Sequence, residues 1–343
     1  MEWYRTLARP GFFALPPEAA HRLATTLLGL PLPWERLGRA VHDPVLHTDV
    51  VGVPIDNPVG LAAGFDKTGR RLEALGRLGF GYVVGGTFTR RPRAGNPRPR
   101  IARHVHRSSM TNAMGLPNPG AEAAAGNLAR ARRTTARLAS IADEDLADVV
   151  ETHALLEPSV DAIELNASCP NVAWGRDRDD EAHLTALLRA LGERRTKPLL
   201  VKLPPFVTPA EREAVLALAR IAVDHGADGL TCSNTRPVRD ARLATGRGGL
   251  SGRALSTITP AIVGSVADAV ERAVPIAACG GIATPGDAFA CLEAGAATVQ
   301  VYSALVFRGP GVVGELTAGL AAALGGRGAP DVPARGRAAA DRA

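Results

Sequence analysis

Eight short apolar runs alternate with longer amphipathic segments from residue 59 onward, and this alternation limits the possible folds most strongly. The amphipathic segments, such as residues 69–80, 209–226 and 285–296, space apolar residues at i, i+3 and i+4 and end near a glycine that suits a helix C-terminus. A strand followed by a helix, repeated eight times, predicts an α/β fold of the (β/α)8 barrel type rather than an open sheet. The runs are VGLAAGF (59–65), YVVGGTFT (82–89), ARLASI (136–141), AIELNAS (162–168), LLVKLP (199–204), GLTCSN (229–234), IAACGG (276–281) and TVQVYS (298–303).

The chain divides into three parts by composition. The barrel is expected to occupy residues 46–325, after an N-terminal helical segment of residues 1–45 with two amphipathic stretches separated by prolines. Apolar and cationic side chains alternate on these stretches, so the segment either caps the barrel or lies on a membrane surface. Residues 326–343 are rich in Gly, Pro, Ala and Arg and are predicted to be disordered.

The composition favours a reduced globular protein. Of 343 residues, 46% are hydrophobic, which suffices for a large core, and no apolar run reaches the roughly 20 residues of a membrane-spanning helix. The N-terminus lacks the pattern of an export signal. Cys169, Cys232, Cys279 and Cys291 form no C-x-x-C pair and have no matching histidines, so neither a metal site nor a disulfide framework is expected.

The net charge of +6 has one local centre, the arginine-rich segment of residues 89–107. Such a cluster is either a solvated loop or a nucleic-acid patch. Because aromatic stacking residues are absent from it, we interpret it as a solvated loop and expect no nucleic-acid partner.

Polar or glycine residues follow all eight predicted strands. In such barrels the chemistry gathers at the C-terminal ends of the strands, so these residues predict one shared pocket. They are Asp66 and Lys67, Thr87, Ser140, Asn166 with Cys169 and Asn171, Lys202, Asn234 with Thr235, Gly280 with Gly281, and Tyr302 with Ser303.

Three features of this pocket indicate its ligand. Glycine-rich turns after the last two strands favour a phosphate held by backbone amides, although a glycine pair can also be a plain tight turn. Lys202 lies in an apolar strand, so it either reaches the barrel mouth or faces an anionic group in the pocket. Several asparagines share the strand ends, and their paired donors and acceptors suit a planar ring such as a pyrimidine.

The motifs as a set resemble the dihydroorotate dehydrogenase family, flavin enzymes that oxidise dihydroorotate to orotate in the synthesis of pyrimidines and UMP. They follow the family's order from about residue 57 to 310, and the N-terminal segment, PPEAAHRLA included, resembles that of the membrane-associated class 2 (quinone) enzymes. The motifs are NPVGLAAGFDK, GTFTRRPRAGNPRPR, NAMGLPNPG, NASCPN, VKLPP, SNTR, GGLSGRAL, CGGI and VQVYSALVFRGP.

The resemblance implies a role for individual residues, and Cys169 falls on the catalytic base. Positions that hold FMN correspond to Ala63, Gly64, Thr87, Ser140, Asn166, Lys202, Ser233, Gly252, Gly281, Tyr302 and Ser303. Positions around dihydroorotate correspond to Lys67, Asn112, Met114, Gly115, Leu116, Asn166, Asn171, Asn234 and Thr235.

Two positions depart from the class 2 pattern. Class 2 enzymes carry serine where this chain has Cys169, whereas the soluble class 1 enzymes carry cysteine there. Ser140 replaces a flavin-contacting asparagine of the class 2 enzymes. A cysteine, with an ordinary pKa of about 8.5, needs less activation than a serine to remove a proton. The alternative interpretation of Cys169 is a small buried hydrophobe.

The electron acceptor depends on residues 1–45. If they form an apolar tunnel to the flavin, a membrane quinone is expected, with the protein peripheral on the cytoplasmic face of the cell membrane. If they only cap the barrel, fumarate or another soluble oxidant and a cytoplasmic location follow. Two further alternatives are a flavin barrel acting on another dihydropyrimidine, such as one in RNA, and a non-catalytic flavin-binding relative.

Overall fold

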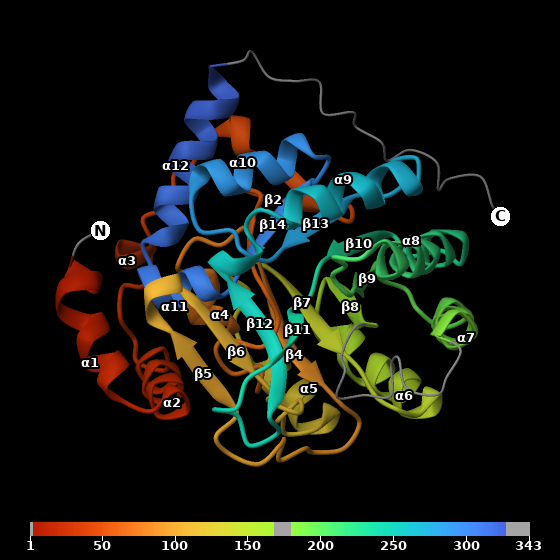
Figure 1. Ribbon diagram of the computed structural model, residues 1–343, viewed down its shortest axis with the longest axis horizontal. Coiled ribbons are helices and arrows are strands. Elements are labelled where there is room, and N and C mark those ends of the chain that lie inside the picture. Colours follow the sequence, from red (N-terminus) through yellow and green to blue (C-terminus); the bar gives the residue numbers. More distant parts are fainter. Residues whose placement is uncertain (1–2, 168–179, 327–343) are drawn as a thin grey trace.

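Eight parallel strands close into a barrel in the computed structural model, which describes residues 3–167 and 180–326. Each strand pairs with the next along the chain, and the last pairs with the first, so the predicted (β/α)8 barrel is confirmed (Figure 1). The eight apolar runs of the sequence all supply barrel strands. In chain order these are β3 (Val59–Leu61), β4 (Tyr82–Phe88), β7 (Ala136–Ile141), β8 (Ala162–Asn166), β9 (Leu199–Leu203), β10 (Gly229–Cys232), β13 (Ile276–Cys279) and β14 (Thr298–Val301).

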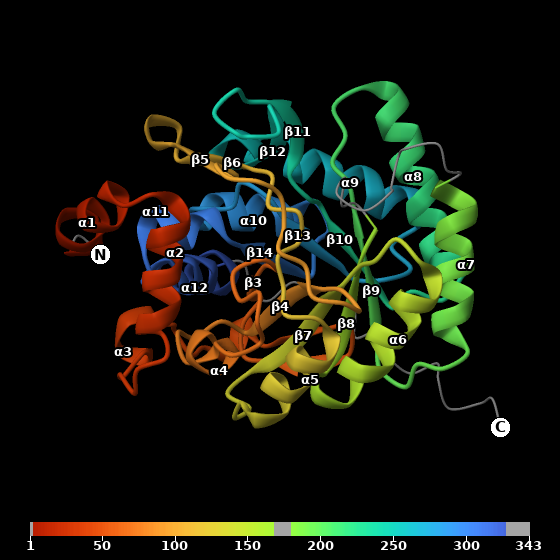
Figure 2. The same ribbon diagram turned by 90° about the horizontal axis from the view of Figure 1, so that it is seen from below.

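Helices surround the barrel and bury their apolar stripes against it (Figure 2). The predicted helical segments are confirmed, although the one expected over residues 69–80 is helical only over its central turn, Leu72–Gly76. The longer helices have clear N-terminal signals, since Thr208 with Glu211 and Thr284 with Asp287 form capping boxes. The barrel helices are α4 (Leu72–Gly76), α5 (Ala121–Arg130), α6 (Leu146–Leu156), α7 (Asp180–Gly192), α8 (Pro209–Asp224), α9 (Thr259–Ala269), α10 (Pro285–Glu293), α11 (Ser303–Arg308) and α12 (Val312–Gly325).

The N-terminal segment is helical, as expected. A π-helical turn (Tyr4–Ala8) runs into α1 (Arg9–Ala14), and α2 (Pro17–Leu27) and α3 (Glu35–Gly38) follow. Among the described residues no helix is both long and apolar enough to cross a membrane. A small hairpin of β1 (Thr48–Val50) and β2 (Val53–Ile55) then packs its apolar side chains against the base of the barrel.

A second, antiparallel sheet lies over the C-terminal ends of the barrel strands, and the sequence analysis did not anticipate it. We call it the roof sheet; its strands are β5 (Ile101–His104), β6 (Ser109–Asn112), β11 (Arg236–Arg239) and β12 (Arg247–Gly252), in the order β11-β12-β6-β5. Its two halves come from the loops after β4 and β10, which brings distant segments side by side (Figure 1).

The prediction of a solvated loop for residues 89–107 is wrong in part. Arg100 is only 6% exposed, and its Nε donates to Glu18 of α2 at 2.9 Å. Arg93 pairs with Asp143 at 2.6 Å, and Arg98 also pairs with Glu18. Carboxylates of the chain itself therefore neutralise these three arginines, which reduces the cationic patch on which the RNA alternative depended.

Candidate active site

One cavity of about 1800 Å³ lies between the barrel, the roof sheet and the N-terminal helices. It is larger than the roughly 300–1,000 Å³ of a usual small-molecule pocket, so it has room for more than one ligand. The predicted site residues that line it are Ala63, Gly64, Lys67, Thr87, Asn112, Met114, Gly115, Leu116, Asn166, Lys202, Ser233, Asn234, Thr235, Gly252, Gly281, Tyr302 and Ser303.

Among the described residues, one predicted site residue, Ser140, does not line the cavity. Ser140 is fully buried, and its hydroxyl lies 3.0 Å from the Thr87 hydroxyl, so it can reach a ligand only through Thr87. Cys169 and Asn171 lie outside the described residues.

A hydrogen-bonded row of amides and hydroxyls crosses the floor of the cavity. The Asn166 amide donates to the Thr87 hydroxyl at 3.2 Å, and the Asn234 amide donates to the Asn166 carbonyl at 3.3 Å. These side chains come from the ends of β4, β8 and β10, as the barrel geometry predicts. The row holds donors and acceptors in fixed positions for a planar polar ligand.

Lys202 is the buried cation of the cavity. It is 5% exposed, and its Nζ lies 3.5 Å from Oε1 of Glu164, which is fully buried inside the barrel. Burial alone lowers the pKa of Lys202, but the neighbouring Cys279 and Glu164 outweigh burial and raise it. Glu164 also accepts hydrogen bonds from Thr231 at 2.9 Å and Gln300 at 3.3 Å. The ammonium group is therefore charged and fixed against the cavity wall.

Lys67 is a second cation beside the cavity, and its charge is less firmly held. Burial lowers the pKa of Lys67 to about 8, although Asp66 partly opposes the shift. Its ammonium group donates to the carbonyl of Gly64. An anionic ligand placed beside Lys67 is stabilised most when the lysine is protonated, that is, below about pH 8.

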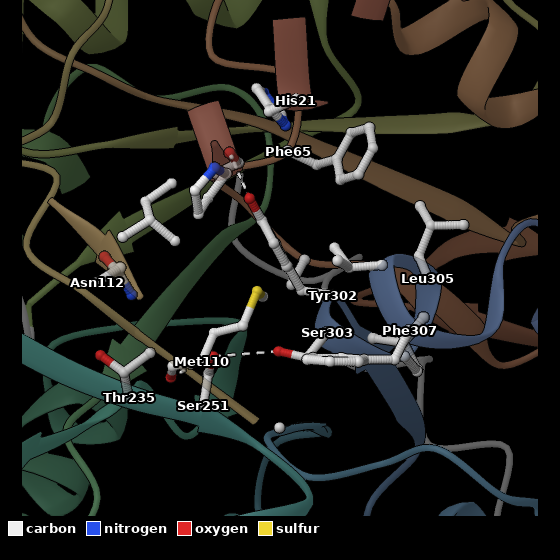
Figure 3. Close-up of a pocket in the computed structure, with 18 of the residues that line it drawn as sticks. His21, Phe65, Met110, Asn112, Thr235, Ser251, Tyr302, Ser303, Leu305 and Phe307 are labelled. Carbon is white, nitrogen blue, oxygen red and sulfur yellow. Dashed lines mark hydrogen bonds between the residues drawn. The ribbon is translucent and has the colours of Figure 1, made fainter. Parts of the chain in front are cut away.

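Glycines let the backbone come close at the far side of the cavity. A Cβ on Gly281, whose φ is +75°, would lie 2.2 Å from the Ser256 nitrogen, and one on Gly252 would lie 2.5 Å from the Ser108 carbonyl. Beside them the Ser303 hydroxyl donates to Ser251 of the roof sheet at 3.1 Å (Figure 3). The tight backbone and the hydroxyls of Ser251 and Ser303, which line the cavity, suit the phosphate that the sequence predicts.

The cavity continues as an apolar passage beneath α1 and α2. The rings of His21 and Phe65 meet edge to face with centroids 5.2 Å apart, and Phe65 meets Tyr302 at 5.7 Å (Figure 3). Phe13 packs on Phe307 at 5.4 Å. Burial, together with the nearby Lys67, lowers the pKa of His21 to about 3, so this imidazole is neutral at physiological pH.

Sequence reasoning missed Glu164, Gln300 and Arg103. The first two interrupt apolar barrel strands, and a polar residue within such a run is the signal that could have found them. Arg103 stacks over the Phe13 ring at 4.6 Å and donates to the Phe12 carbonyl at 3.2 Å, which ties the roof sheet to α1. Only the unanticipated roof sheet brings Arg103 there.

Comparisons with known proteins agree on one family. The sequence profile described as Dihydroorotate dehydrogenase matches residues 45–324. The chain is 38% identical over 332 residues to the dihydroorotate dehydrogenase (quinone) of Novosphingobium aromaticivorans, covering 92% of this chain and 93% of that protein. It is 39% identical to the enzyme of the same name from Rhodospirillum rubrum, covering 94% and 91%.

Solved structures give the same result for the fold. A crystal structure of DHODH from Eimeria tenella in complex with ferulenol superposes with a TM-score of 0.81 at 28% sequence identity. The match covers 91% of this chain and 92% of that one. A ligand-free crystal structure of the same protein matches with a TM-score of 0.79.

Proposed function

The chain belongs to the dihydroorotate dehydrogenase family, and we propose that it oxidises (S)-dihydroorotate to orotate and passes the electrons to a membrane quinone. The reaction is a step of de novo pyrimidine synthesis, and its enzyme is an oxidoreductase acting on a CH–CH donor. Relatives that share 38–39% of their residues with this chain carry the quinone name.

One observation carries this proposal, namely that a polar floor and an apolar passage belong to the same cavity. The floor presents the amides of Asn166 and Asn234 together with Lys202, and the roof sheet adds the amide of Asn112. The passage is lined by rings and aliphatic side chains of α1 and α2. A polar, anionic substrate and an apolar acceptor thus have separate approaches to one centre. A soluble acceptor such as fumarate has no need of the apolar approach.

The family is flavin-dependent, and we propose FMN as the flavin of this chain. Lys202 supports this choice, because a buried ammonium stabilises negative charge on a reduced ring, and the close backbone at Gly252 and Gly281 suits its phosphate. Such a flavin would supply the acceptor for a hydride from C6 of dihydroorotate and the carrier of two electrons to the quinone. The residues proposed to hold it are Ala63, Gly64, Thr87, Asn166, Lys202, Ser233, Gly252, Gly281, Tyr302 and Ser303, with Ser140 acting through Thr87.

The residues of the chain have three tasks in this reaction. Lys67, with its partly buried ammonium, pairs with the carboxylate of dihydroorotate. Asn112, Asn166, Asn234 and Thr235 hold the ring edge, together with the backbone of residues 114–116 and with Asn171. Cys169 removes the proton from C5 as the general base.

Exposed apolar side chains on the N-terminal segment support peripheral membrane contact. Leu7 is 76% exposed, and Leu23, Leu30 and Leu32 are each more than 40% exposed. Exposed leucines on and between short helices, in a segment that also carries arginines, suit the interface of an anionic bilayer. We propose that this face rests on the cytoplasmic surface of the cell membrane and receives the quinone there.

The direct test is anaerobic reduction of the bound flavin. Purified protein is expected to carry a yellow flavin that dihydroorotate bleaches without oxygen and that a ubiquinone or menaquinone analogue restores. Stopped-flow absorbance measures both steps. A flavin that stays oxidised at saturating dihydroorotate contradicts the proposed substrate, and reoxidation by fumarate faster than by the quinones contradicts the proposed acceptor.

The apolar passage predicts a variant that separates the two half-reactions. Ala24 lines the passage from α2, so Ala24→Trp is expected to fill it and to lower quinone-dependent reoxidation at least about tenfold. Bleaching by dihydroorotate is expected to keep its wild-type rate, because the polar floor is unchanged. Thr26→Trp, an equally large change at an exposed position of the same helix, is the matched control. Equal reoxidation rates in the two variants would contradict the passage.

A further inference from the structure

Two arginines face each other at the outer end of the roof sheet. Arg239 of β11 and Arg247 of β12 are register partners in the antiparallel ladder. Directly opposed residues have Cβ atoms about 5 Å apart, and like charges in this position destabilise a sheet. Both side chains are exposed, and both line the main cavity. The pair therefore places two positive charges together at a mouth of the cavity.

No acidic side chain in the described ranges neutralises this pair. The nearest carboxylate in sequence, Asp240, points to the other face of the sheet, where it accepts hydrogen bonds from Thr111 and from the Arg242 guanidinium at 2.7 Å. Arg253, on the same loop as the pair, is bound to Asp287 at 3.0 Å. An arginine pair that costs stability and stays without a carboxylate suits a site for a transient anion.

The cavity face of β12 connects this mouth to the polar floor. Alternate residues share a face, so Arg247, Gly249 and Ser251 follow one another toward the barrel, in steps of about 7 Å. Gly249 lies opposite Asn112, whose amide donates to the Gly249 carbonyl at 3.4 Å, and Ser251 is bonded to Ser303. Arg247 thus lies two residues along β12 from Gly249, the partner of Asn112, and on the same face of the sheet.

This mouth is separate from the apolar passage. Figure 2 shows α1 and α2 at the left edge of the molecule and the β11–β12 turn at the top. The substrate proposed above carries a carboxylate and suits the cationic mouth, whereas the proposed acceptor is apolar and suits the passage beneath α1 and α2.

We propose that Arg239 and Arg247 form an encounter site that captures the carboxylate of dihydroorotate and directs it along β12 to Asn112 and Lys67. This inference rests on the proposed function and adds the route by which the substrate enters. The arginines act on association and not on the bound complex, because Lys67 and the floor amides complete the final site.

The test is the salt dependence of flavin reduction in the Arg239→Gln/Arg247→Gln double variant of the holoenzyme. At an ionic strength of about 20 mM the variant is expected to show a kcat/KM for dihydroorotate about tenfold below wild type, with kcat at saturating substrate unchanged. Near 300 mM the Debye length is only a few ångströms, so the kcat/KM values of the two proteins are expected to converge. The lysine double variant, which keeps both charges, is expected to behave like wild type.

Two controls make the outcome decisive. Arg189→Gln/Arg220→Gln removes the same net charge from exposed sites on α7 and α8 and is expected to leave kcat/KM unchanged. The melting temperature of the arginine variant is expected not to fall, because the substitution relieves repulsion. If the arginine variant has the same kcat/KM and the same salt dependence as the wild-type protein, the encounter site is wrong but the proposed function stands. If dihydroorotate does not bleach the flavin of the wild-type protein, both the proposed function and the encounter site are wrong.

Discussion

Replacing Cys169 with alanine is expected to lower the rate of flavin reduction by dihydroorotate at least about a thousandfold while the flavin stays bound. General-base catalysis contributes factors of about 10² to 10⁴, and the substitution removes the side chain proposed to take the proton from C5. Cys169→Ser is expected to recover activity only as the pH rises, because a serine hydroxyl is a far weaker acid than a thiol. Stopped-flow bleaching between about pH 6 and pH 10 measures both effects.

Cys291→Ala provides the control for this substitution. Cys291 is buried on α10 away from the cavity, so its loss tests the cost of removing a thiol without touching the site. Near-wild-type bleaching by the Cys169→Ala protein at neutral pH would show that Cys169 is a packing residue and that the base lies elsewhere.

The Lys202→Met variant is expected to lose both stability and activity, for separable reasons. It leaves the fully buried Glu164 without its cation, and removing one partner of a buried ion pair typically costs about 3–5 kcal/mol in the free energy of unfolding. It also removes the positive charge at the proposed flavin, so we expect reduction to slow about a hundredfold.

The Glu164→Gln/Lys202→Met double variant separates these two effects. The double variant is expected to recover most of the lost free energy of unfolding, measured with denaturant, because it leaves no unpaired charge at Glu164. Its rate of flavin reduction is expected to stay low. Lys197→Met is the lysine control, since its ammonium contacts the Glu157 carbonyl at 2.7 Å outside the cavity. If the double variant regained wild-type reduction, Lys202 would serve only to neutralise Glu164.

The barrel was predictable because its strands are buried on both faces and form continuous apolar runs such as 199–204. The roof sheet was not, because its strands carry one solvent face and polar sequences such as RIARH (100–104) and RPVR (236–239), which look like loops. Its pairing is also non-local, since β6 and β12 lie more than 130 residues apart in the chain. No local sequence pattern predicts a strand pairing over such a separation.

The candidate site was predictable where it follows directly from the barrel. Thr87, Asn166 and Lys202 end barrel strands, and the cavity contains all three. Glu164 was missed because it is a single carboxylate within an apolar run. Its burial is explained only by its ion pair with Lys202 on the next strand, which the sequence does not show. Arg98 and Arg100 were assigned to solvent because their partner, Glu18, lies about 80 positions away.

The roof sheet also sets which changes in chain length the site can accept. Met110 and Asn112 face the cavity, whereas Ser109 and Thr111 face the opposite groove beside His104. One residue inserted into Ser109–Asn112 would exchange these two sets and turn Asn112 away from the cavity without altering a single catalytic side chain. The β11–β12 turn, residues 240–246, lies outside the paired strands, so an insertion there does not exchange the two faces. Natural or engineered insertions in this enzyme are therefore expected to accumulate in that turn, where they can reshape the proposed substrate entrance while the roof strands stay in register.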